Sequence, residues 1–352
     1  MSTSNPLVSV VIPTHNRAYC LPEAIDSALG QTYSNIEVVL VDDGSTDGTD
    51  ALIAQRYGHD ARVRLIQQKQ SGTNIARNTG LRNARGDMVA LLDSDDIFLP
   101  WKLELEVACL NALPEVGMIW TDMDAFSDAG VVHPRFLRRM YSNYHRFPTE
   151  RIFSASRPLA PIVPGLAHKV GSAQLFHGDI FGPMVMGNLV HTSTSVIRRE
   201  RLEKVRGFDE TLVRSGVDFD FHLRTCREGP VAYADVSTIR YRIGMADAMT
   251  HPSRRVKMAE NFLRTILPVI ERDRARINMS QKEIDDVLAE AETFIGEAMI
   301  NNDDHRNARG HLVKSLRLRP WQPEAVKLLA LSCVPKQAKE PLRRAYHRLR
   351  GR

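Results

Sequence analysis

Three carboxylates stand within four positions at Asp93, Asp95 and Asp96, directly after the apolar run 88–92. Acids this close repel one another unless something neutralises their charge. Divalent cations such as Mg²⁺ and Mn²⁺ prefer oxygen ligands, and Mg²⁺ usually binds one or two carboxylates together with substrate phosphates. The cluster therefore predicts a metal site for a phosphorylated substrate. The alternative is a loop in which Asp95 or Asp96 caps a helix that enters at Pro100.

A second pair of acids, Asp42 and Asp43, follows the apolar run 36–41 and opens a glycine-rich turn. Asp47, further along, has a structural role available, because it could cap the helix that begins near Thr49. Asp42 and Asp43 precede the turn, and their oxygens could accept hydrogen bonds from a base NH or a ribose hydroxyl. These two carboxylates are therefore candidates for recognising a nucleoside.

The segment 71–80 opens a helix, and Arg77 lies just inside it. The first turn of a helix offers free backbone N–H groups, and a guanidinium pairs well with phosphate oxygens, so both features suit a diphosphate. The alternative is a capped helix with a surface arginine.

The apolar pattern predicts the elements that position these polar segments. Apolar runs typical of buried strands occur at 7–13, 36–41, 62–66 and 87–92, and helix-like segments at about 19–31, from 49, and 72–84. This alternation predicts an α/β fold over residues 7–121, with a mostly parallel central sheet covered by helices. No Gly-x-Gly-x-x-Gly follows the first strand, which argues against a dinucleotide-binding domain.

A helix at 101–113 and a strand at 116–120 complete this part of the chain. Asp122 and Asp124 follow that strand and are expected in a turn. The last two strands of the sheet are expected at 231–236 and 238–243.

Four segments in this order resemble one known family: 8–17, the turn 42–47, and the segments 72–80 and 92–96. Together they are similar to the nucleotide-binding half of glycosyltransferase family two, which has the Rossmann-like GT-A fold. The resemblance implies an inverting glycosyltransferase of the hexosyl or N-acetylhexosaminyl type. It also implies a nucleotide-diphosphate sugar as donor, usually a UDP-sugar, and Mn²⁺ or Mg²⁺ as cofactor.

The resemblance assigns roles within the nucleotide-binding half. Asp43 would contact the base, and Arg77 would face the diphosphate. Asp95 would lie nearest the metal, and Asp93 would support it through the ribose or a metal-bound water. The remaining residues expected to bind the nucleotide-sugar are Pro13, Thr14, Asn16, Arg17, Asp42, Ser94 and Arg242.

A second block resembles the family's strand beside the donor sugar, at 187–197, and its Glu-Asp element with the general base, within 207–224. Inverting transfer needs a carboxylate that takes the acceptor's hydroxyl proton while the anomeric carbon is attacked from the opposite face. The matching residue is Asp218, with Asp220 as a supporting or alternative base. Val217 stands where the family usually has glutamate. The alternative for Asp218 is a helix acid stabilised by the helix dipole.

Two further stretches have no motif of their own that assigns a role. Residues 126–185 lack periodicity, and they either shape the acceptor side or form a variable surface excursion. After Arg242 the family often has a histidine near the diphosphate, whereas the nearest histidine here is His251. By analogy, residues 244–253 would close over the donor.

The chain is expected to contain a catalytic domain at 1–250 and a helical extension at 251–352. Within the catalytic domain, residues 1–121 would form the nucleotide-binding half and residues 122–250 the acceptor-side half.

The extension shows apolar residues at helical spacing over 284–298 and 308–316. A helix–turn–helix followed by Pro320 resembles one tetratricopeptide-like unit, whereas arrays need several. Residues 336–352 carry seven Lys or Arg against one Glu. Such a basic amphipathic tail suits an anionic membrane surface, and the alternative is a solvated helix packed on its neighbour. The extension is also the candidate surface for a homo-oligomer.

Composition narrows the class of protein. The chain has 352 residues and a formal net charge of +5, which is mild, so no nucleic-acid partner is expected. Four scattered cysteines without a Cys-x-x-Cys pair favour a reducing cytosol over a disulfide framework. No signal-peptide pattern opens the sequence, and no apolar run approaches the ~18 residues of a spanning helix. We expect a cytoplasmic protein whose membrane contact, if any, is peripheral on the inner face of the cytoplasmic membrane.

Three functions from different classes follow. The leading one is metal-dependent, inverting transfer of a sugar to a glycan or lipid-linked acceptor in cell-envelope polysaccharide synthesis. The second is a degenerate homologue that binds nucleotide-sugars or partners without turnover, as Val217 and the missing histidine would favour. The third is a nucleotidyltransferase-like enzyme, which should carry a Gly-rich basic loop after the first strand; residues 14–17 are not such a loop.

Overall fold

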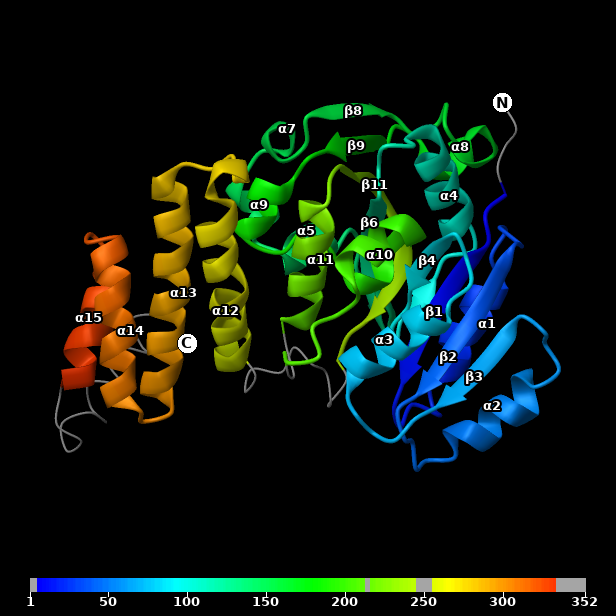
Figure 1. Cartoon of the computed structure of the whole chain (residues 1–352), viewed down its shortest axis with the longest axis horizontal. Coiled ribbons are helices and arrows are strands. Elements are labelled where there is room, and N and C mark those ends of the chain that lie inside the picture. Colours follow the sequence, from blue (N-terminus) through cyan, green and yellow to red (C-terminus); the bar gives the residue numbers. More distant parts are fainter. Residues whose placement is uncertain (1–4, 213–215, 245–254, 334–352) are drawn as a thin grey trace. The chain divides into compact units, whose positions relative to one another are not determined.

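The computed structural model describes residues 5–212, 216–244 and 255–333 (Figure 1). The chain divides into two compact units, residues 1–213 with 217–248 and residues 214–216 with 249–352. Most of the segment expected to close over the donor, and the whole basic tail, lie outside the described residues.

The first unit is built on an eleven-stranded sheet with the strand order β3-β2-β1-β4-β10-β6-β11-β9-β8, while β5 pairs with β11 and β7 with β6. The strands are β1 (Val8–Thr14), β2 (Ile36–Asp42), β3 (Val63–Gln67), β4 (Met88–Leu91), β5 (Ile97–Phe98), β6 (Met118–Ser127), β7 (Gly130–His133), β8 (Ala155–Pro158), β9 (Gln174–Gly178), β10 (Ser195–Arg198) and β11 (Val231–Arg242). Strands β3, β2, β1 and β4 are parallel neighbours, and so are β6 and β11. Strand β10 joins the two groups because it lies antiparallel between β4 and β6.

The strands and helices within residues 7–121 show why this part of the chain forms a parallel sheet. Every residue of β1, β2 and β4 is buried, as expected for strands covered by helices on both faces. The helices between and after these strands are α1 (Leu21–Leu29), α2 (Thr49–Tyr57), α3 (Thr73–Asn83) and α4 (Lys102–Ala112). Helix α3 approaches β1 closely because Gly80 lacks a side chain: a Cβ there would lie 2.2 Å from a methyl carbon of Val11. The predicted fold class, a largely parallel sheet with helical cover and a helical extension, is confirmed (Figure 1).

The described residues after 121 in the first unit form short elements that sequence periodicity did not reveal. Its helices are α5 (Leu137–Met140), α6 (Asn143–Arg146), α7 (Thr149–Ile152), η1 (Pro164–Leu166), α8 (Ala167–Val170), α9 (Phe181–Val185), η2 (Thr192–Thr194), α10 (Arg199–Val205) and α11 (Val217–Arg227). Strands β8 and β9 pair antiparallel and extend the sheet beyond β11.

Three local predictions were wrong. Asp122 and Asp124 belong to β6, not to a turn. The stretch expected to hold the last strands forms one twelve-residue strand, β11, with an irregular register between Ala234 and Ile239. Of residues 187–197 only the last three join a strand, since residues 192–194 form the 3₁₀ turn η2.

The described part of the second unit is helical, as predicted. It contains α12 (Arg255–Asp273), η4 (Arg274–Arg276), α13 (Gln281–Asn301), α14 (His305–Leu318) and α15 (Pro323–Cys333). A capping box between Ser280 and Glu283 starts α13. The buried residues shared by α13, α14 and α15 are Ile300, Ala308, Leu312, Ala325 and Leu328.

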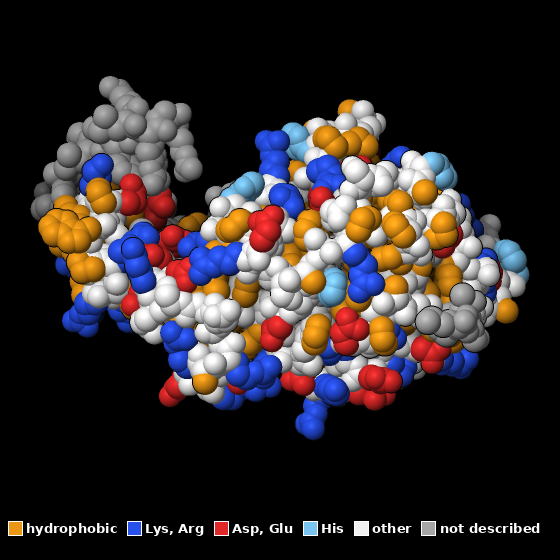
Figure 2. All heavy atoms as spheres, turned by 90° about the horizontal axis from the view of Figure 1, so that it is seen from above, with side chains coloured by type: hydrophobic (Ala, Val, Ile, Leu, Met, Phe, Trp, Pro, Cys, Tyr) orange, Lys and Arg blue, Asp and Glu red, His pale blue; other side chains and the backbone are white. Residues whose placement is uncertain are grey.

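The described surface is mixed in character. Lys and Arg side chains are interspersed with Asp and Glu on the face that Figure 2 shows, and hydrophobic side chains lie in small groups between them. Among the described helices, none combines the length and apolarity that crossing a membrane requires.

Candidate active site

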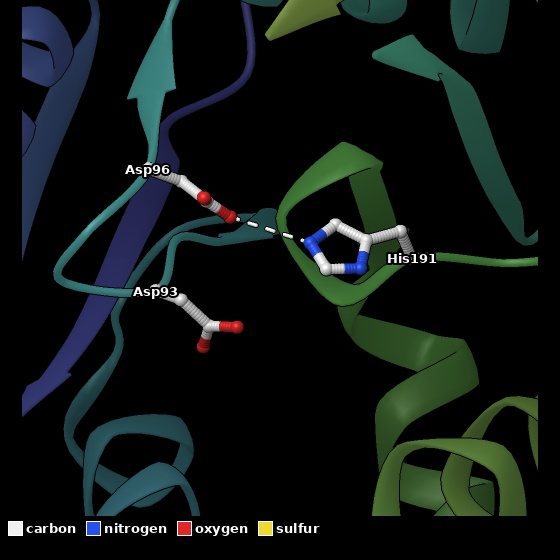
Figure 3. Close-up of side chains that lie close together, drawn as sticks. All are labelled: Asp93, Asp96 and His191. Atoms are coloured by element: carbon white, nitrogen blue, oxygen red, sulfur yellow. Dashed lines mark hydrogen bonds and ion pairs between the residues drawn. The ribbon is translucent and has the colours of Figure 1, made fainter. Parts of the chain in front are cut away.

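Three side chains from two separate segments form a compact cluster beside the end of β4 (Figure 3). The donor atoms of Asp93, Asp96 and His191 all lie within 4.8 Å of one another. The Asp96 carboxylate accepts a 2.6 Å hydrogen bond from the Ser193 hydroxyl and lies 3.3 Å from the His191 Nε2. Two carboxylates and an imidazole at this spacing could hold a divalent cation.

The surroundings of the cluster shift the pKa values of its side chains and of Asp95 in different directions. Burial would raise the pKa of Asp93, but the positive charge of Arg77, 2.5 Å away, and of His191 lowers it overall. Burial would lower the pKa of His191, but its hydrogen bond and proximity to Asp96 raise it overall. Burial and the charges of Asp96 and Asp93 raise the pKa of Asp95 to about 7. The raised pKa of Asp95 indicates that the neighbouring cations do not fully offset the repulsion among the three carboxylates, a repulsion that a bound cation would reduce.

The predicted metal residues are only partly brought together. Asp93 belongs to the cluster, whereas the Asp95 carboxylate is not part of it and lies 3.9 Å from the Arg17 guanidinium. Asp96 and His191 were not predicted as ligands. The sequence shows only that the run 191–195 is polar. The structure shows that this run is buried throughout, so that its polar groups need partners.

The predicted nucleoside contacts lie at the ends of β1 and β2. The buried Asp43 carboxylate accepts hydrogen bonds from the backbone N–H groups of Ser71 (2.8 Å) and Gly72 (2.7 Å) and from the Gln68 amide (2.7 Å). Asp43 thus fastens the loop before α3. Asp42 accepts a hydrogen bond from the Ser45 backbone N–H, which closes the turn after β2.

The loop after β1 is tied to the same turn. Asn16, with a positive φ of 52°, accepts a 2.8 Å hydrogen bond from the Thr46 N–H. Pro13 and Thr14 are buried in β1, and the Thr14 hydroxyl has no hydrogen-bond partner among the described residues. A buried hydroxyl without a partner is a position where a ligand atom would be stabilised.

Helix α3 connects the nucleotide-binding half to the loop that precedes α11. Asn78 accepts a 2.8 Å hydrogen bond from the Phe208 N–H and donates to the Phe208 carbonyl (2.9 Å). Asn74 donates to the carbonyls of Asp209 and Leu212. The Arg77 guanidinium lies over the Phe208 ring, 5.2 Å from its centroid. Two predicted functional segments, the Arg77 helix and the segment leading to Asp218, are therefore fastened to each other.

The predicted base, Asp218, is half-buried in the first turn of α11. The charge of Asp218 raises the pKa of Tyr141 and of His191. Burial has a larger effect on both groups: it raises the pKa of Tyr141 and lowers the pKa of His191. Asp218 is therefore within electrostatic reach of the cluster formed by Asp93, Asp96 and His191. Val217 beside it is buried in the core.

Asp220 has a different environment from Asp218. Both the Nε and an Nη of Arg224, one helical turn later, donate to its carboxylate at 2.9 and 2.6 Å. This ion pair occupies an oxygen that a general base would need free.

The other predicted contacts lie around the same cluster. The Arg242 Nε donates to the Asp95 carbonyl, its backbone N–H donates to Asp96, and its guanidinium lies 3.1 Å from Glu23. The backbone carbonyl of the buried Ser94 accepts from the Cys20 thiol. Arg242 therefore anchors the acidic loop to β11.

The chain is similar to known glycosyltransferases. Residues 9–165 match the family model described as glycosyl transferase family 2. The putative glycosyltransferase EpsE of Bacillus subtilis (strain 168) is 30% identical over 296 residues, which cover 80% of this chain and 97% of that protein. The chondroitin synthase of Escherichia coli is 43% identical over 106 residues, or 30% of this chain and 15% of that protein. In several relatives with similar matches, named uncharacterized glycosyltransferases from Rickettsia species, the aligned part is only 16–36% of the protein.

Solved structures share the architecture. S. aureus TarS (residues 1–349), in complex with UDP-GlcNAc, superposes with a TM-score of 0.59 at 17% identity, over 96% of this chain and 92% of that one. The mannosyltransferase PcManGT of Pyrobaculum calidifontis, in complex with GDP-Man and Mn²⁺, has a TM-score of 0.50 at 20% identity, over 93% and 80% of the two chains. The fold is that of GT-A enzymes. The chain belongs to glycosyl transferase family 2 and is a glycosyltransferase.

Proposed function

We propose that the protein is a metal-dependent, inverting glycosyltransferase that takes its sugar from a UDP-sugar. The observation that carries the proposal is the convergence of Asp93, Asp96 and His191 next to Arg77 and the start of α11. The fold shared with TarS, whose structure contains UDP-GlcNAc, supports a nucleotide-sugar donor.

Asp93, Asp96 and His191 would hold the cation, because carboxylate oxygens suit Mn²⁺ and Mg²⁺, and the added imidazole nitrogen favours Mn²⁺ of the two. A bound cation would neutralise charge that develops on the departing diphosphate. Arg77, already paired with Asp93, would add positive charge from the helix side. Asp95 stays a predicted neighbour of the metal, held near Arg17.

Asp218 would remove the proton from the acceptor hydroxyl as that oxygen attacks the anomeric carbon. Its position in the first turn of α11, where its charge influences His191, supports this assignment, and among the described residues it has no ion pair like that of Asp220. Asp43, Thr14 and the turns around Asn16 would form the nucleoside end of the pocket.

The acceptor would be a glycan or a lipid-linked oligosaccharide of cell-envelope polysaccharide synthesis, and the sugar a hexose or N-acetylhexosamine. The similarity to chondroitin synthase supports a glycan product. Such a transfer from a nucleotide-sugar would take place in the cytoplasm or on the inner face of its membrane.

A panel of nucleotide-sugars tests the proposal. Hydrolysis of UDP-glucose, UDP-galactose, UDP-N-acetylglucosamine, UDP-N-acetylgalactosamine and GDP-mannose should be measured with Mn²⁺, with Mg²⁺ and with EDTA. We expect at least one UDP-sugar to be hydrolysed with metal and not with EDTA. If no donor of the panel is hydrolysed or bound in the presence of metal, the proposal is wrong.

Replacing His191 by alanine is expected to weaken Mn²⁺ binding in the presence of UDP by about 10–100-fold or more, the range known for outer-shell partners of metal ligands. Calorimetric or paramagnetic titration of Mn²⁺ would measure this change. The exposed His168 of the same unit provides a matched control, and H168A should bind Mn²⁺ like the wild type. Equal affinities in both variants would exclude His191 as a ligand.

A further inference from the structure

Four aromatic rings form a row that leads from partly exposed residues to the cluster of Asp93, Asp96 and His191. His133 and Phe136 are nearly parallel with centroids 5.7 Å apart, and Phe136 and Tyr241 are nearly parallel at 6.1 Å. Tyr241 then meets His191 edge-on at 4.9 Å. His133, Phe136 and Tyr241 are each partly exposed, whereas His191 is buried in the cluster.

The rings of the row are offset from one another. Parallel rings whose centroids are about 6 Å apart are laterally displaced, because rings in full face contact would be much closer. Ala125 lies between His133 and Tyr241 in the register of β7, β6 and β11. Since Ala125 carries only a methyl group, the Phe136 ring can lie across this position. The result is a stepped, partly exposed aromatic surface, defined by His133, Phe136 and Tyr241, which we name the aromatic platform.

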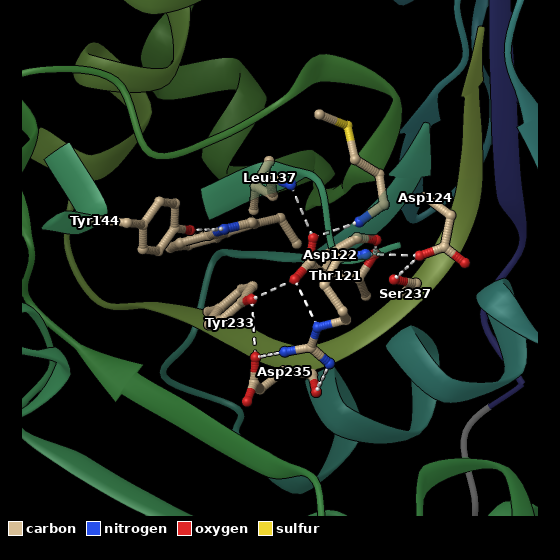
Figure 4. Close-up of polar contacts among 11 residues, drawn as sticks. Thr121, Asp122, Asp124, Leu137, Tyr144, Tyr233, Asp235 and Ser237 are labelled. Carbon is tan, nitrogen blue, oxygen red and sulfur yellow. Dashed lines mark hydrogen bonds and ion pairs between the residues drawn. The ribbon is translucent and has the colours of Figure 1, made fainter. Parts of the chain in front are cut away.

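The backbone on both sides of Phe136, the central residue of the platform, is held by strand carboxylates, among them Asp122 and Asp124, which Figure 4 labels. The Phe136 N–H donates to the Met123 carbonyl at 2.7 Å. The N–H groups on either side donate to strand carboxylates, Arg135 to Asp124 (2.9 Å) and Leu137 to Asp122 (3.0 Å).

The Arg135 side chain strengthens this anchorage. It pairs with Asp122 at 2.9 Å and with Asp235 of β11, while its backbone has a positive φ of 53°. A non-glycine residue persists in that strained conformation only where its surroundings enforce it. Burial raises the pKa of Asp122, and Arg135 opposes this effect. Phe136 is therefore held in place before any ligand arrives.

We propose that the aromatic platform is the acceptor subsite, and that it takes a glycan with at least two pyranose rings. This proposal rests on the proposed function. The faces of pyranose rings present C–H groups, which are attracted to the negative faces of aromatic rings while the hydroxyls stay in water. The reacting sugar would lie by Tyr241, next to His191 and the cluster, and the preceding sugar by Phe136.

Two observations favour a glycan over the donor's nucleobase as the occupant. The predicted nucleoside contacts are at β1 and β2, whereas the platform residues His133 and Tyr241 lie on β7 and β11, with β4 and β10 between these groups in the sheet. The platform also spans two ring-to-ring steps, which matches successive sugars of a chain.

Binding of defined oligosaccharides tests the platform without knowledge of the natural acceptor. The probes are cellotriose, chitotriose and maltotriose, measured by saturation-transfer NMR and by titration on the full chain saturated with UDP and Mn²⁺. We expect at least one to bind the wild type, and Phe136→Ala to weaken it about tenfold, the scale of lost stacking on an aromatic ring. Phe136→Tyr, which keeps the ring, should bind like the wild type. Trp321→Ala removes a 94% exposed aromatic residue of the second unit and is the matched control.

The outcomes separate the two proposals. Failure of the wild type to bind UDP with Mn²⁺ would overturn the proposed function. With UDP bound normally, the platform is refuted if no oligosaccharide binds, or if Phe136→Ala binds as tightly as the wild type. A tenfold loss of UDP affinity in Phe136→Ala, with oligosaccharide affinity retained, would also refute it, because the ring would then serve the nucleotide.

Discussion

Replacing Asp218 by asparagine is expected to reduce transfer, or hydrolysis of the donor, by about 10²-fold or more while leaving donor affinity within about twofold. Asparagine has nearly the same shape, but its amide cannot accept the proton of the attacking hydroxyl. The half-buried position of Asp218 in the first turn of α11 limits its structural role, so the fold should persist. Initial rates at saturating donor, and calorimetric titration of UDP with Mn²⁺, separate the two quantities.

Asp220→Asn distinguishes between the two candidate bases. The Asp220 carboxylate is paired with Arg224. Asp220→Asn should therefore lower the transfer rate much less than Asp218→Asn does, and it should act mainly by releasing Arg224 from this pair. If Asp218→Asn retains the wild-type rate, Asp218 is not the base. If Asp220→Asn alone loses about 10²-fold, the role belongs to Asp220.

Replacing Lys102 by methionine is expected to lower the free energy of unfolding by about 3–5 kcal/mol, because it leaves a buried acid without its partner. Lys102 and Glu106 are fully buried in α4 and form an ion pair one helical turn apart. The second oxygen of Glu106 has no hydrogen-bond partner among the described residues. Urea unfolding followed by circular dichroism would measure the loss.

The loss of stability in Lys102→Met should increase as the pH rises. Burial raises the pKa of Glu106 from its ordinary 4.5 to about 7, although Lys102 opposes the rise. A carboxyl that holds its proton more tightly when folded makes stability fall as pH increases between these two values. Without Lys102 the folded pKa rises further, so the deficit of Lys102→Met relative to the wild type should grow above pH 7.

Two control variants test whether the loss of stability comes from the unpaired buried charge of Glu106. The double variant Lys102→Met/Glu106→Leu removes both charges and should recover most of the loss. Arg56→Met breaks the exposed pair with Asp26 and should cost less than about 1 kcal/mol. A Lys102→Met variant as stable as the wild type, or a double variant as unstable as the single one, would contradict the prediction.

The nucleotide-binding half could be predicted from sequence because its signals are local. The strands β1 and β2 are long, apolar and buried on both faces, and each ends in polar residues. The Asp93–Asp96 loop was recognisable for the same reason. The presence of His191 in the cluster could not be predicted, because His191 lies about a hundred residues away and reaches the loop through β10.

The acceptor-side half could not be predicted in the same way. Helices of four or five residues, such as α5 and α9, are too short for periodicity to appear. Asp122 and Asp124 were assigned to a turn because carboxylates are uncommon inside strands. Asp122 is accommodated in β6 by Arg135 and by two backbone N–H groups, contacts that depend on the folded chain.

The place of β10 in the sheet also has a consequence for biosynthesis. Strands β1 to β4 can pair as soon as they leave the ribosome, but the outer edge of β4 is covered only by Ser195–Arg198, about a hundred residues later. At ~5–20 residues per second, this edge stays open for roughly 5–20 s, and an open apolar edge invites pairing with other chains. We therefore expect nascent chains that stop before residue 195 to aggregate or to engage chaperones, and chains extended past residue 198 to escape this fate.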